Sequence, residues 1–302
     1  MKLHTLPITL RQLQYVCAVA QELSFSRAAV RCGVSQPSLS AQIAEVERML
    51  DVTLFERSRR GVLITPAGQD LVGRARMVLL AAEDLLEAAR QHTDPLTGPL
   101  RLGIIPTLAP YMLPDIDPAL RKTFKALEPR WIENKTEVLV EMLRQGELDA
   151  ALLALEADLG ALEHAAIGMD EFVVAACPDH PLGQTSAPVD PDALRQHRVM
   201  LLDDGHCFRD QALDVCGLVG AGEHGFRATS LTTLVQMTAA GQCVTILPNM
   251  AVEIENRRQQ LTVRRFSSPA PRRTIVLAWR PGSPSTEALQ QLAKVAQKAY
   301  QA

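Results

Sequence analysis

A reactive thiol is the first chemistry that the sequence suggests, in the segment LLDDGHCFRDQALDVCG (residues 201–217). Cysteine reacts with oxidants as its thiolate, which a neighbouring cation or a helix N-terminus favours. Gly205 interrupts the preceding apolar run, so we expect Cys207 to open the next helix, with His206 beside it and Arg209 two positions on. A thiolate there can attack peroxide, become a sulfenic acid and condense with a second thiol that reaches it.

Cys216 follows Cys207 by nine positions, and this spacing constrains a bond between them. On one continuous helix the two would lie about 13 Å apart along the axis, at roughly 1.5 Å per residue. A disulfide needs Cα atoms roughly 4.4 to 6.8 Å apart. The bond would therefore require the segment to unwind, which would couple oxidation to a change of shape. The alternative is that both cysteines are small buried hydrophobic residues.

The six cysteines are too scattered for a structural disulfide framework, and none forms a CxxC pair. The close Cys and His group at residues 206–216 is one ligand short of a zinc site, so we expect no metal and no cofactor. Cys17 and Cys32 are expected in the core of N-terminal helices. Cys177 and Cys243 are expected to be buried structural residues, although either could divert a sulfenic acid to a different partner.

Around this chemistry, residues 1–65 have the pattern of three short helices followed by a hairpin. After a break at residues 24–26, Ser26 is expected to cap a second helix and Gly33 to end it, and Ser35 to cap a third with Pro37 in its first turn. Two short helices joined through a glycine turn form a helix-turn-helix. The apolar runs at residues 52–55 and 62–64 then predict a hairpin with a basic tip, the wing.

In helix-turn-helix proteins the first residues of the second helix of the motif enter the major groove, where glutamine suits adenine edges and serine suits bases or phosphates. The expected base-contacting residues are Ser35, Gln36, Pro37, Ser38, Ser40 and Gln42. The expected phosphate-contacting residues on the hairpin are Arg57, Arg59 and Arg60. Residues 1–60 carry eight Lys or Arg against five Asp or Glu, and three of these basic residues are the arginines of the hairpin. The alternative is an ordinary capped helix followed by a solvated turn.

Three segments divide the chain. Residues 1–65 are the expected DNA-binding domain, and the alanine-rich helix within residues 66–92 suits a linker that pairs with another copy. The break HTDPLTGP (residues 92–99) introduces a regulatory domain at residues 93–302. Its alternating apolar runs and helical stretches predict an α/β fold with a mainly parallel sheet, which binds ligands at the carboxyl ends of its strands.

The composition excludes several classes of protein. Mean hydropathy is +0.03 and no run of about 18 apolar residues occurs, so we expect no membrane association. The first residues, MKLHTLPITLRQLQ, lack the apolar core of a secretory signal, so a cytoplasmic location is expected. The net charge of −3 argues against a protein that coats nucleic acid uniformly.

Residues 8–91 resemble the N-terminal domain of LysR-type transcriptional regulators, in LRQLQYVCAVAQELSFSRAA, VSQPSLSAQI and LFERSRRGVLITPAG. The resemblance extends over the whole chain. It implies a two-lobed, periplasmic-binding-protein-like α/β effector domain behind a winged helix-turn-helix. It also implies a homodimer joined through the linker helices, commonly a tetramer, that binds double-stranded promoter DNA and works with RNA polymerase.

The segment GHCFRDQALDVC resembles the sensing segment of the peroxide-responsive members of that family, as do IPTLAPYMLP, FRATSLTTL and PRRTIVLAWRPGSP. By this resemblance Cys207 is the peroxidatic cysteine and Cys216 the resolving one. The residues that would hold hydrogen peroxide are Thr107, His206, Asp210 and Arg273. Cys243 stands where the family usually has glycine.

Two other hypotheses remain beside a thiol-based peroxide sensor. One is a regulator of the same family that binds a small molecule between its lobes, with incidental cysteines. The other is an enzyme such as a thiol peroxidase. A DNA-binding domain contributes nothing to turnover, and the sequence shows no other nucleophile and base pair or phosphate loop, so we expect no enzyme.

Overall fold

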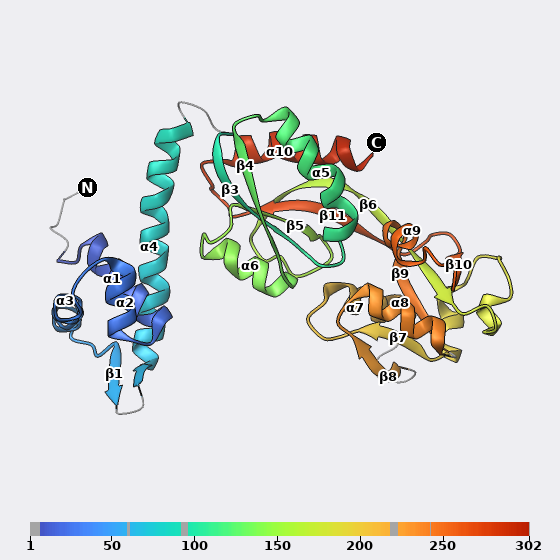
Figure 1. Ribbon diagram of the computed structural model, residues 1–302, viewed down its shortest axis with the longest axis horizontal. Coiled ribbons are helices and arrows are strands. Elements are labelled where there is room, and N and C mark those ends of the chain that lie inside the picture. Colours follow the sequence, from blue (N-terminus) through green and yellow to red (C-terminus); the bar gives the residue numbers. More distant parts are fainter. Residues whose placement is uncertain (1–6, 59–60, 92–95, 218–222, 242, 302) are drawn as a thin grey trace. The chain divides into compact units, whose positions relative to one another are not determined.

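The computed structural model describes residues 7–58, 61–91, 96–217, 223–241 and 243–301. The chain divides into two compact units, residues 1–90 and 91–302 (Figure 1). Within the described residues, no helix is both long and apolar enough to cross a membrane.

The first unit is a winged helix-turn-helix with a long helix behind it, as predicted. Leu39, Ile43 and Val46 form one buried stripe of the third helix and pack against apolar residues of the first two helices. The elements are α1 (Leu10–Glu22), α2 (Phe25–Cys32), α3 (Gln36–Leu50), β1 (Phe55–Ser58), β2 (Gly61–Ile64) and α4 (Pro66–Gln91). β1 begins at Phe55, three residues later than the sequence pattern predicted.

Capping side chains and one glycine set the bounds of these helices. Gly33 ends α2 with a φ of 66°, and the Ser35 hydroxyl accepts a hydrogen bond from the Ser38 amide at the start of α3, both as predicted. The predicted cap of α2 was wrong: Ser24, not Ser26, accepts the bond from the Arg27 amide. Ser24 has the extended backbone that a cap requires, whereas Ser26 already lies in the helix.

The second unit is one mixed sheet of strand order β4-β3-β5-β11-β6-β9-β7-β8, with β10 paired to β6. The prediction of a mainly parallel sheet was wrong, because β6 runs antiparallel to β9, β10 and β11, and β11 runs antiparallel to β5. The strands are β3 (Gly98–Ile104), β4 (Leu127–Glu133), β5 (Ala150–Ala154), β6 (Glu163–Ala176), β7 (Val199–Leu202), β8 (Glu223–Ala228), β9 (Val244–Pro248), β10 (Thr262–Arg265) and β11 (Arg272–Trp279). The helices are α5 (Ala109–Thr123), α6 (Thr136–Arg144), α7 (Cys207–Cys216), α8 (Leu231–Ala240), α9 (Val252–Glu255) and α10 (Thr286–Tyr300).

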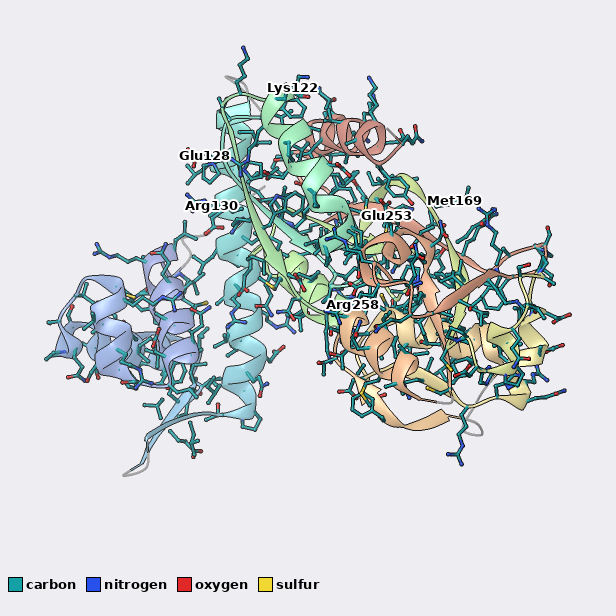
Figure 2. The ribbon with its side chains drawn as sticks, turned by 45° about the vertical axis from the view of Figure 1, so that its right-hand side comes forward. Lys122, Glu128, Arg130, Met169, Glu253 and Arg258 are labelled. Carbon is teal, nitrogen blue, oxygen red and sulfur yellow. The ribbon has the colours of Figure 1, made fainter. Side chains whose placement is uncertain are left out.

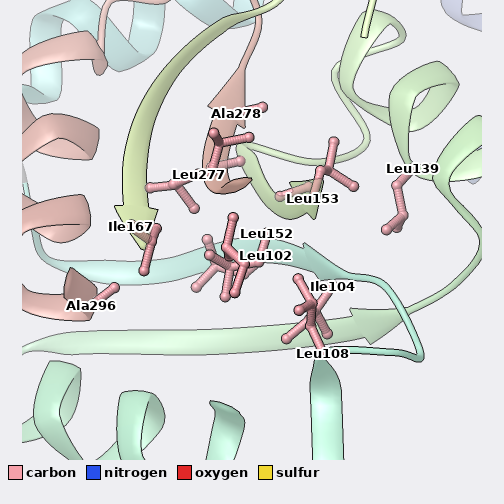
Figure 3. Close-up of a cluster of buried hydrophobic side chains, with 14 of the residues drawn as sticks. Leu102, Ile104, Leu108, Leu139, Leu152, Leu153, Ile167, Leu277, Ala278 and Ala296 are labelled. Carbon is pink, nitrogen blue, oxygen red and sulfur yellow. The ribbon is translucent and has the colours of Figure 1, made fainter. Parts of the chain in front are cut away.

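Two separate hydrophobic cores divide this unit into two lobes. The first core gathers Leu102, Leu152 and Leu277 from β3, β5 and β11 (Figure 3). The second core contains Val174, from the far end of the long strand β6, together with residues of β7, β9 and α8. β6 therefore joins the two lobes.

Charged side chains such as Lys122, Glu128, Arg130 and Arg258 are exposed on the outside of this unit (Figure 2).

Two glycines of α4 provide a matched stability test. A Cβ at Gly68 would lie 2.3 Å from the carbonyl oxygen of Leu54, whereas one at Gly73 would meet nothing within 4 Å. We expect Gly68→Ala to lower the free energy of unfolding of the first unit by about 1 to 3 kcal/mol through overpacking. Gly73→Ala is the control and should raise it by about 0.5 to 1 kcal/mol, because alanine favours helix. Urea denaturation followed by circular dichroism measures both, and equal effects would show that the close approach is absent.

Candidate functional site

Cys207 lies at the seam between the two lobes. Its side chain packs with the core of the first lobe, whereas the next residue, Phe208, belongs to the core of the second. Cys207 is the first residue of α7, as the sequence predicted. A residue in this place is coupled to the packing of both lobes.

The turn before Cys207 is held by a residue of the first lobe. Gly205 has a φ of 84°, a backbone conformation that favours glycine, and a Cβ on it would lie 3.0 Å from the Lys135 side chain. The Lys135 ammonium donates a 2.6 Å hydrogen bond to the carbonyl oxygen of Asp204. Lys135 immediately precedes α6, so the start of that helix fixes the entry into α7.

A buried arginine organises the groups behind the thiol. The Arg273 guanidinium is fully buried and contacts Asp170, its direct cross-strand partner, at 2.9 and 3.0 Å. It donates to the Thr107 hydroxyl at 2.8 Å and to the Thr107 carbonyl oxygen at 3.0 Å. Its Cζ atom lies 5.5 Å from the centre of the Phe208 ring. The arginine therefore connects the end of β3 to β6, β11 and α7.

The pKa of Cys207 reflects a balance between burial and this surrounding polarity. Burial is the largest influence and raises the pKa of the thiol above its ordinary value. The adjacent Thr136 hydroxyl, the charge of Arg273 and the backbone amide of Phe208 lower the pKa, and Asp210 raises it. The thiol is thus predominantly protonated at neutral pH, with groups in place that favour the thiolate.

This balance corrects one part of the sequence interpretation. His206 and Arg209 were expected to supply the positive charge beside Cys207. Burial lowers the pKa of His206, with a further lowering by Lys135, so this imidazole is neutral at pH 7. Arg209 donates to the Leu202 carbonyl oxygen and pairs with Asp204. The cation that acts on the thiol is Arg273, which is distant in sequence and which the family resemblance had placed at this site.

The predicted peroxide-binding residues lie around Cys207 in two adjoining hollows. Thr107, His206 and Cys207 line a narrow crevice together with Lys135 and Thr136. Asp210 and Cys207 line a larger cavity of about 250 Å³. Arg273 lies behind the crevice and reaches it through Thr107. The four residues named from the sequence therefore all lie around the Cys207 thiol.

Three residues of this site were not identified from the sequence: Asp170, Thr136 and Gln211. Asp170 is 3% exposed, and burial raises its pKa while Arg273 opposes that shift. In the described part of the chain, Thr136 Oγ1 and both amide atoms of Gln211 are buried without a hydrogen-bond partner, and both residues line the 250 Å³ cavity. Asp170 and Glu171, directly before an apolar run, were the available signal, but the register with β11 is not readable from the sequence.

The second cysteine of the predicted pair ends the same helix. α7 is continuous over its 10 residues from Cys207 to Cys216, which places the two backbones about 13 Å apart along the helix axis. The side chain of Cys216 lies outside the described residues. Cys207 itself is a free thiol.

The predicted DNA-contacting residues lie at the start of α3. Ser35, Gln36, Pro37 and Ser38 are exposed, and Ser40 and Gln42 are partly buried. The side-chain oxygen of Gln42 accepts a hydrogen bond from Gln12 of α1, so part of its capacity is used within the domain. Arg59 and Arg60, and the side chain of Arg57, lie outside the described residues.

Metal ligands do not gather in the part of the chain that the structure describes. There, no three His, Cys, Asp or Glu side chains are close enough to hold an ion.

A DNA-binding winged helix-turn-helix, followed by a two-lobed α/β unit with a polar site at the lobe seam, defines a class of bacterial regulators. Two family models match: "Bacterial regulatory helix-turn-helix protein, lysR family" over residues 10–69, and "LysR substrate binding domain" over residues 93–301. The chain belongs to the LysR family of transcription regulators, which are not enzymes.

Comparison with individual relatives shows which members of this family the chain resembles. The chain is 42% identical to the DNA-binding transcriptional dual regulator OxyR of Escherichia coli, over 95% of this chain and 94% of that protein. It is similar to a full-length OxyR variant from Pseudomonas aeruginosa, with a TM-score of 0.77 and 36% identity over 96% of this chain and 95% of the other. A hydrogen-peroxide-bound OxyR variant from Corynebacterium glutamicum matches with a TM-score of 0.67 and 36% identity, over 98% of this chain and 93% of the other.

The charge balance around Cys207 predicts opposite effects of two substitutions. Asp210→Asn removes a negative charge that raises the pKa of Cys207, so the thiolate fraction at pH 7 should rise about 2- to 5-fold. Thr136→Val removes a group that lowers this pKa and should lower the thiolate fraction. The ultraviolet absorbance of the thiolate between pH 6 and 10, taken as the difference from a Cys207→Ser variant, measures both. Asp214→Asn, an exposed residue of the same cavity, is the control, and an increase as large as that of Asp210→Asn would contradict the assignment.

Proposed function

We propose that this chain is a transcription regulator that senses hydrogen peroxide through Cys207 and signals through a Cys207–Cys216 disulfide. The observation that carries the proposal is the thiol at the start of α7, beside Thr136 and within the field of the buried Arg273. OxyR relatives carry the name "Hydrogen peroxide-inducible genes activator", which supports the same assignment.

The chemistry proceeds in two balanced steps. The Cys207 thiolate attacks one oxygen of hydrogen peroxide, the O–O bond breaks, and the departing hydroxide takes a proton to become water. The Cys216 thiolate then attacks the sulfur of the Cys207 sulfenic acid and releases a second water. Together, two thiols and one peroxide give one disulfide and two waters, so two electrons pass from sulfur to oxygen.

The site has polar groups placed to bind a molecule as small as hydrogen peroxide. The Thr136 hydroxyl beside the thiol and the unpartnered amide of Gln211 can donate to and accept from peroxide oxygens. The Arg273 cation and the Phe208 amide favour the negative charge on sulfur. Larger oxidants are disfavoured because Cys207 is only 9% exposed.

Signalling follows from the geometry of α7. The two cysteine backbones must approach to within roughly 7 Å, so the helix has to unwind between them. Phe208 is buried in the second-lobe core, and Arg209 is tied to Leu202 and Asp204. Unwinding would displace both side chains, which gives the oxidised chain a different lobe surface.

The remaining assignments concern DNA and assembly. Promoter DNA would be read by α3 with its phosphates held by the hairpin arginines, and RNA polymerase is the expected partner. α4 exposes apolar residues suited to pairing with a second copy in a homodimer or tetramer: Met77, Val78, Leu85 and Leu86. A switch of this kind needs its cysteines reduced at rest, which fits the cytoplasm.

A second candidate function is sensing of a small molecule between the lobes. The 250 Å³ cavity beside Cys207 favours it, because its lining combines polar side chains with unpartnered hydrogen-bonding groups. In that case the cysteines would be incidental and Cys207→Ser would leave signalling intact.

Peroxide treatment separates these functions. We expect dilute peroxide to link Cys207 to Cys216 and to change the DNA footprint, and Cys207→Ser to abolish both responses. Mass mapping of alkylated and disulfide-linked peptides, beside a footprinting assay, measures them. Cys32→Ser, in the DNA-binding unit, is the control and should respond as the native chain does. Finding Cys207 free after treatment, or linked elsewhere, would remove the mechanism.

DNA contacts are predicted to separate into two kinds. Gln36→Ala removes a base contact and should weaken binding to a cognate site by about 1 to 3 kcal/mol, with little effect on unrelated DNA. Arg59→Ala removes a phosphate contact, so it should weaken binding to all sequences and reduce the salt slope by about one unit. Titrations of specific and random duplexes at several salt concentrations measure both. A sequence-selective loss in the arginine variant would contradict its assignment.

A further inference from the structure

Two other cysteines of the second lobe face each other across neighbouring strands. β6 and β9 pair antiparallel with the register Phe172 to Pro248 through Ala176 to Val244. The next residue of each chain segment is a cysteine, Cys177 after β6 and Cys243 before β9. Continuing the register by one step sets these two cysteines directly opposite each other.

The antiparallel pairing sets the distance between the two cysteines. The last paired residues of β6 and β9 are Ala176 and Val244, each directly next to a cysteine. The Cys177 carbonyl oxygen accepts a hydrogen bond from the His180 amide, so the chain begins to turn after Cys177. Directly opposite residues of an antiparallel pair have Cα atoms about 4.5 to 5.5 Å apart, inside the range of roughly 4.4 to 6.8 Å that a disulfide spans.

The two side chains share one face of the sheet, because directly opposite residues point the same way. Cys243 is 1% exposed and lies beside Thr238 of α8, whereas Cys177 is 9% exposed. Burial raises the pKa of Cys243, the Thr238 hydroxyl lowers it, and the Cys177 thiol raises it, in keeping with the positions of the two cysteines beside paired strands. Both are free thiols.

We propose that Cys177 and Cys243 are a second peroxide-oxidisable dithiol, which closes to a disulfide between the ends of β6 and β9 without any change of fold. Cys177 is the more exposed thiol and reacts first: its thiolate attacks hydrogen peroxide, giving a sulfenic acid and water. The Cys243 thiolate then attacks that sulfur and releases a second water. Two thiols and one peroxide become one disulfide and two waters, with no reductant or metal involved.

This dithiol differs from the Cys207 site in its consequence. α7 must unwind before Cys207 reaches Cys216, whereas the register of β6 and β9, continued by one residue, sets Cys177 opposite Cys243. The cross-strand bond therefore stabilises the second lobe as it stands and restrains the unfolded chain. It adds stability under oxidation and does not itself change the shape.

The test uses the full chain with Cys207→Ser and Cys216→Ser, so that the other thiol pair is silent and the result does not depend on the proposed sensor. After peroxide treatment and alkylation, mass mapping should find the two peptides linked through Cys177 and Cys243, and equal loss of alkylation at both. The thermal midpoint should rise by about 5 °C with an unchanged circular dichroism spectrum. In a Cys243→Ala background, a sulfenic-acid probe should label Cys177.

Two controls keep the result decisive. Adding Cys32→Ser should leave the crosslink unchanged, because that thiol lies in the first unit. If the double serine variant does not fold, the same peptide map of the native chain distinguishes a Cys177–Cys243 link from a Cys207–Cys216 link. The proposal is overturned if both thiols stay alkylatable after peroxide, or if Cys177 is oxidised to sulfinic acid while Cys243 remains a thiol.

Discussion

The regulatory unit depends on one buried charge, the guanidinium of Arg273. A buried ion costs several kcal/mol unless a partner and hydrogen bonds compensate it, and here the Asp170 carboxylate and both oxygens of Thr107 do so. These partners come from β6 and from the end of β3, and the Phe208 ring adds a contact from α7. The arrangement can form only when the two lobes and the crossing strands are all in place. The polar surroundings of the Cys207 thiol therefore exist only in the folded unit.

The same charge also acts on the thiol, against the effect of burial. Burial alone would hold Cys207 protonated and unreactive, and Arg273, Thr136 and the Phe208 amide partly offset this. A free thiolate in an open site would react with many electrophiles. A mostly protonated thiol in a tight polar seam reacts at a useful rate only with a molecule small enough to enter and able to hydrogen-bond there. In the proposed function, selectivity for peroxide would come from burial, with the polar groups restoring part of the reactivity.

Local signals in the sequence carried much of the fold. Gly33, Ser35 and Gly205 each act within a few residues, so the helix bounds that they set could be predicted, and so could the start of α7 at Cys207. Reasoning from neighbouring residues failed where the deciding contact is distant, and only the family resemblance pointed to Arg273. Arg209 looked like the cation beside the thiol because it is two positions away, yet it pairs with Asp204. The missed Asp170 meets Arg273 through a strand register that no local pattern encodes, and β6 made the sheet mixed.

Local geometry decides what oxidation of each thiol pair would do to the chain. A disulfide between residues whose backbones the fold holds apart needs the fold to yield, so its formation transmits a signal. One between residues that already face each other across two strands restrains the chain where it is. Position in the secondary structure distinguishes the two: Cys207 and Cys216 stand at opposite ends of one helix, and Cys177 and Cys243 at adjoining ends of two paired strands. Since both reactions consume the same oxidant, a chain whose lobe is stabilised by the second bond can tolerate the unwinding that the first one demands.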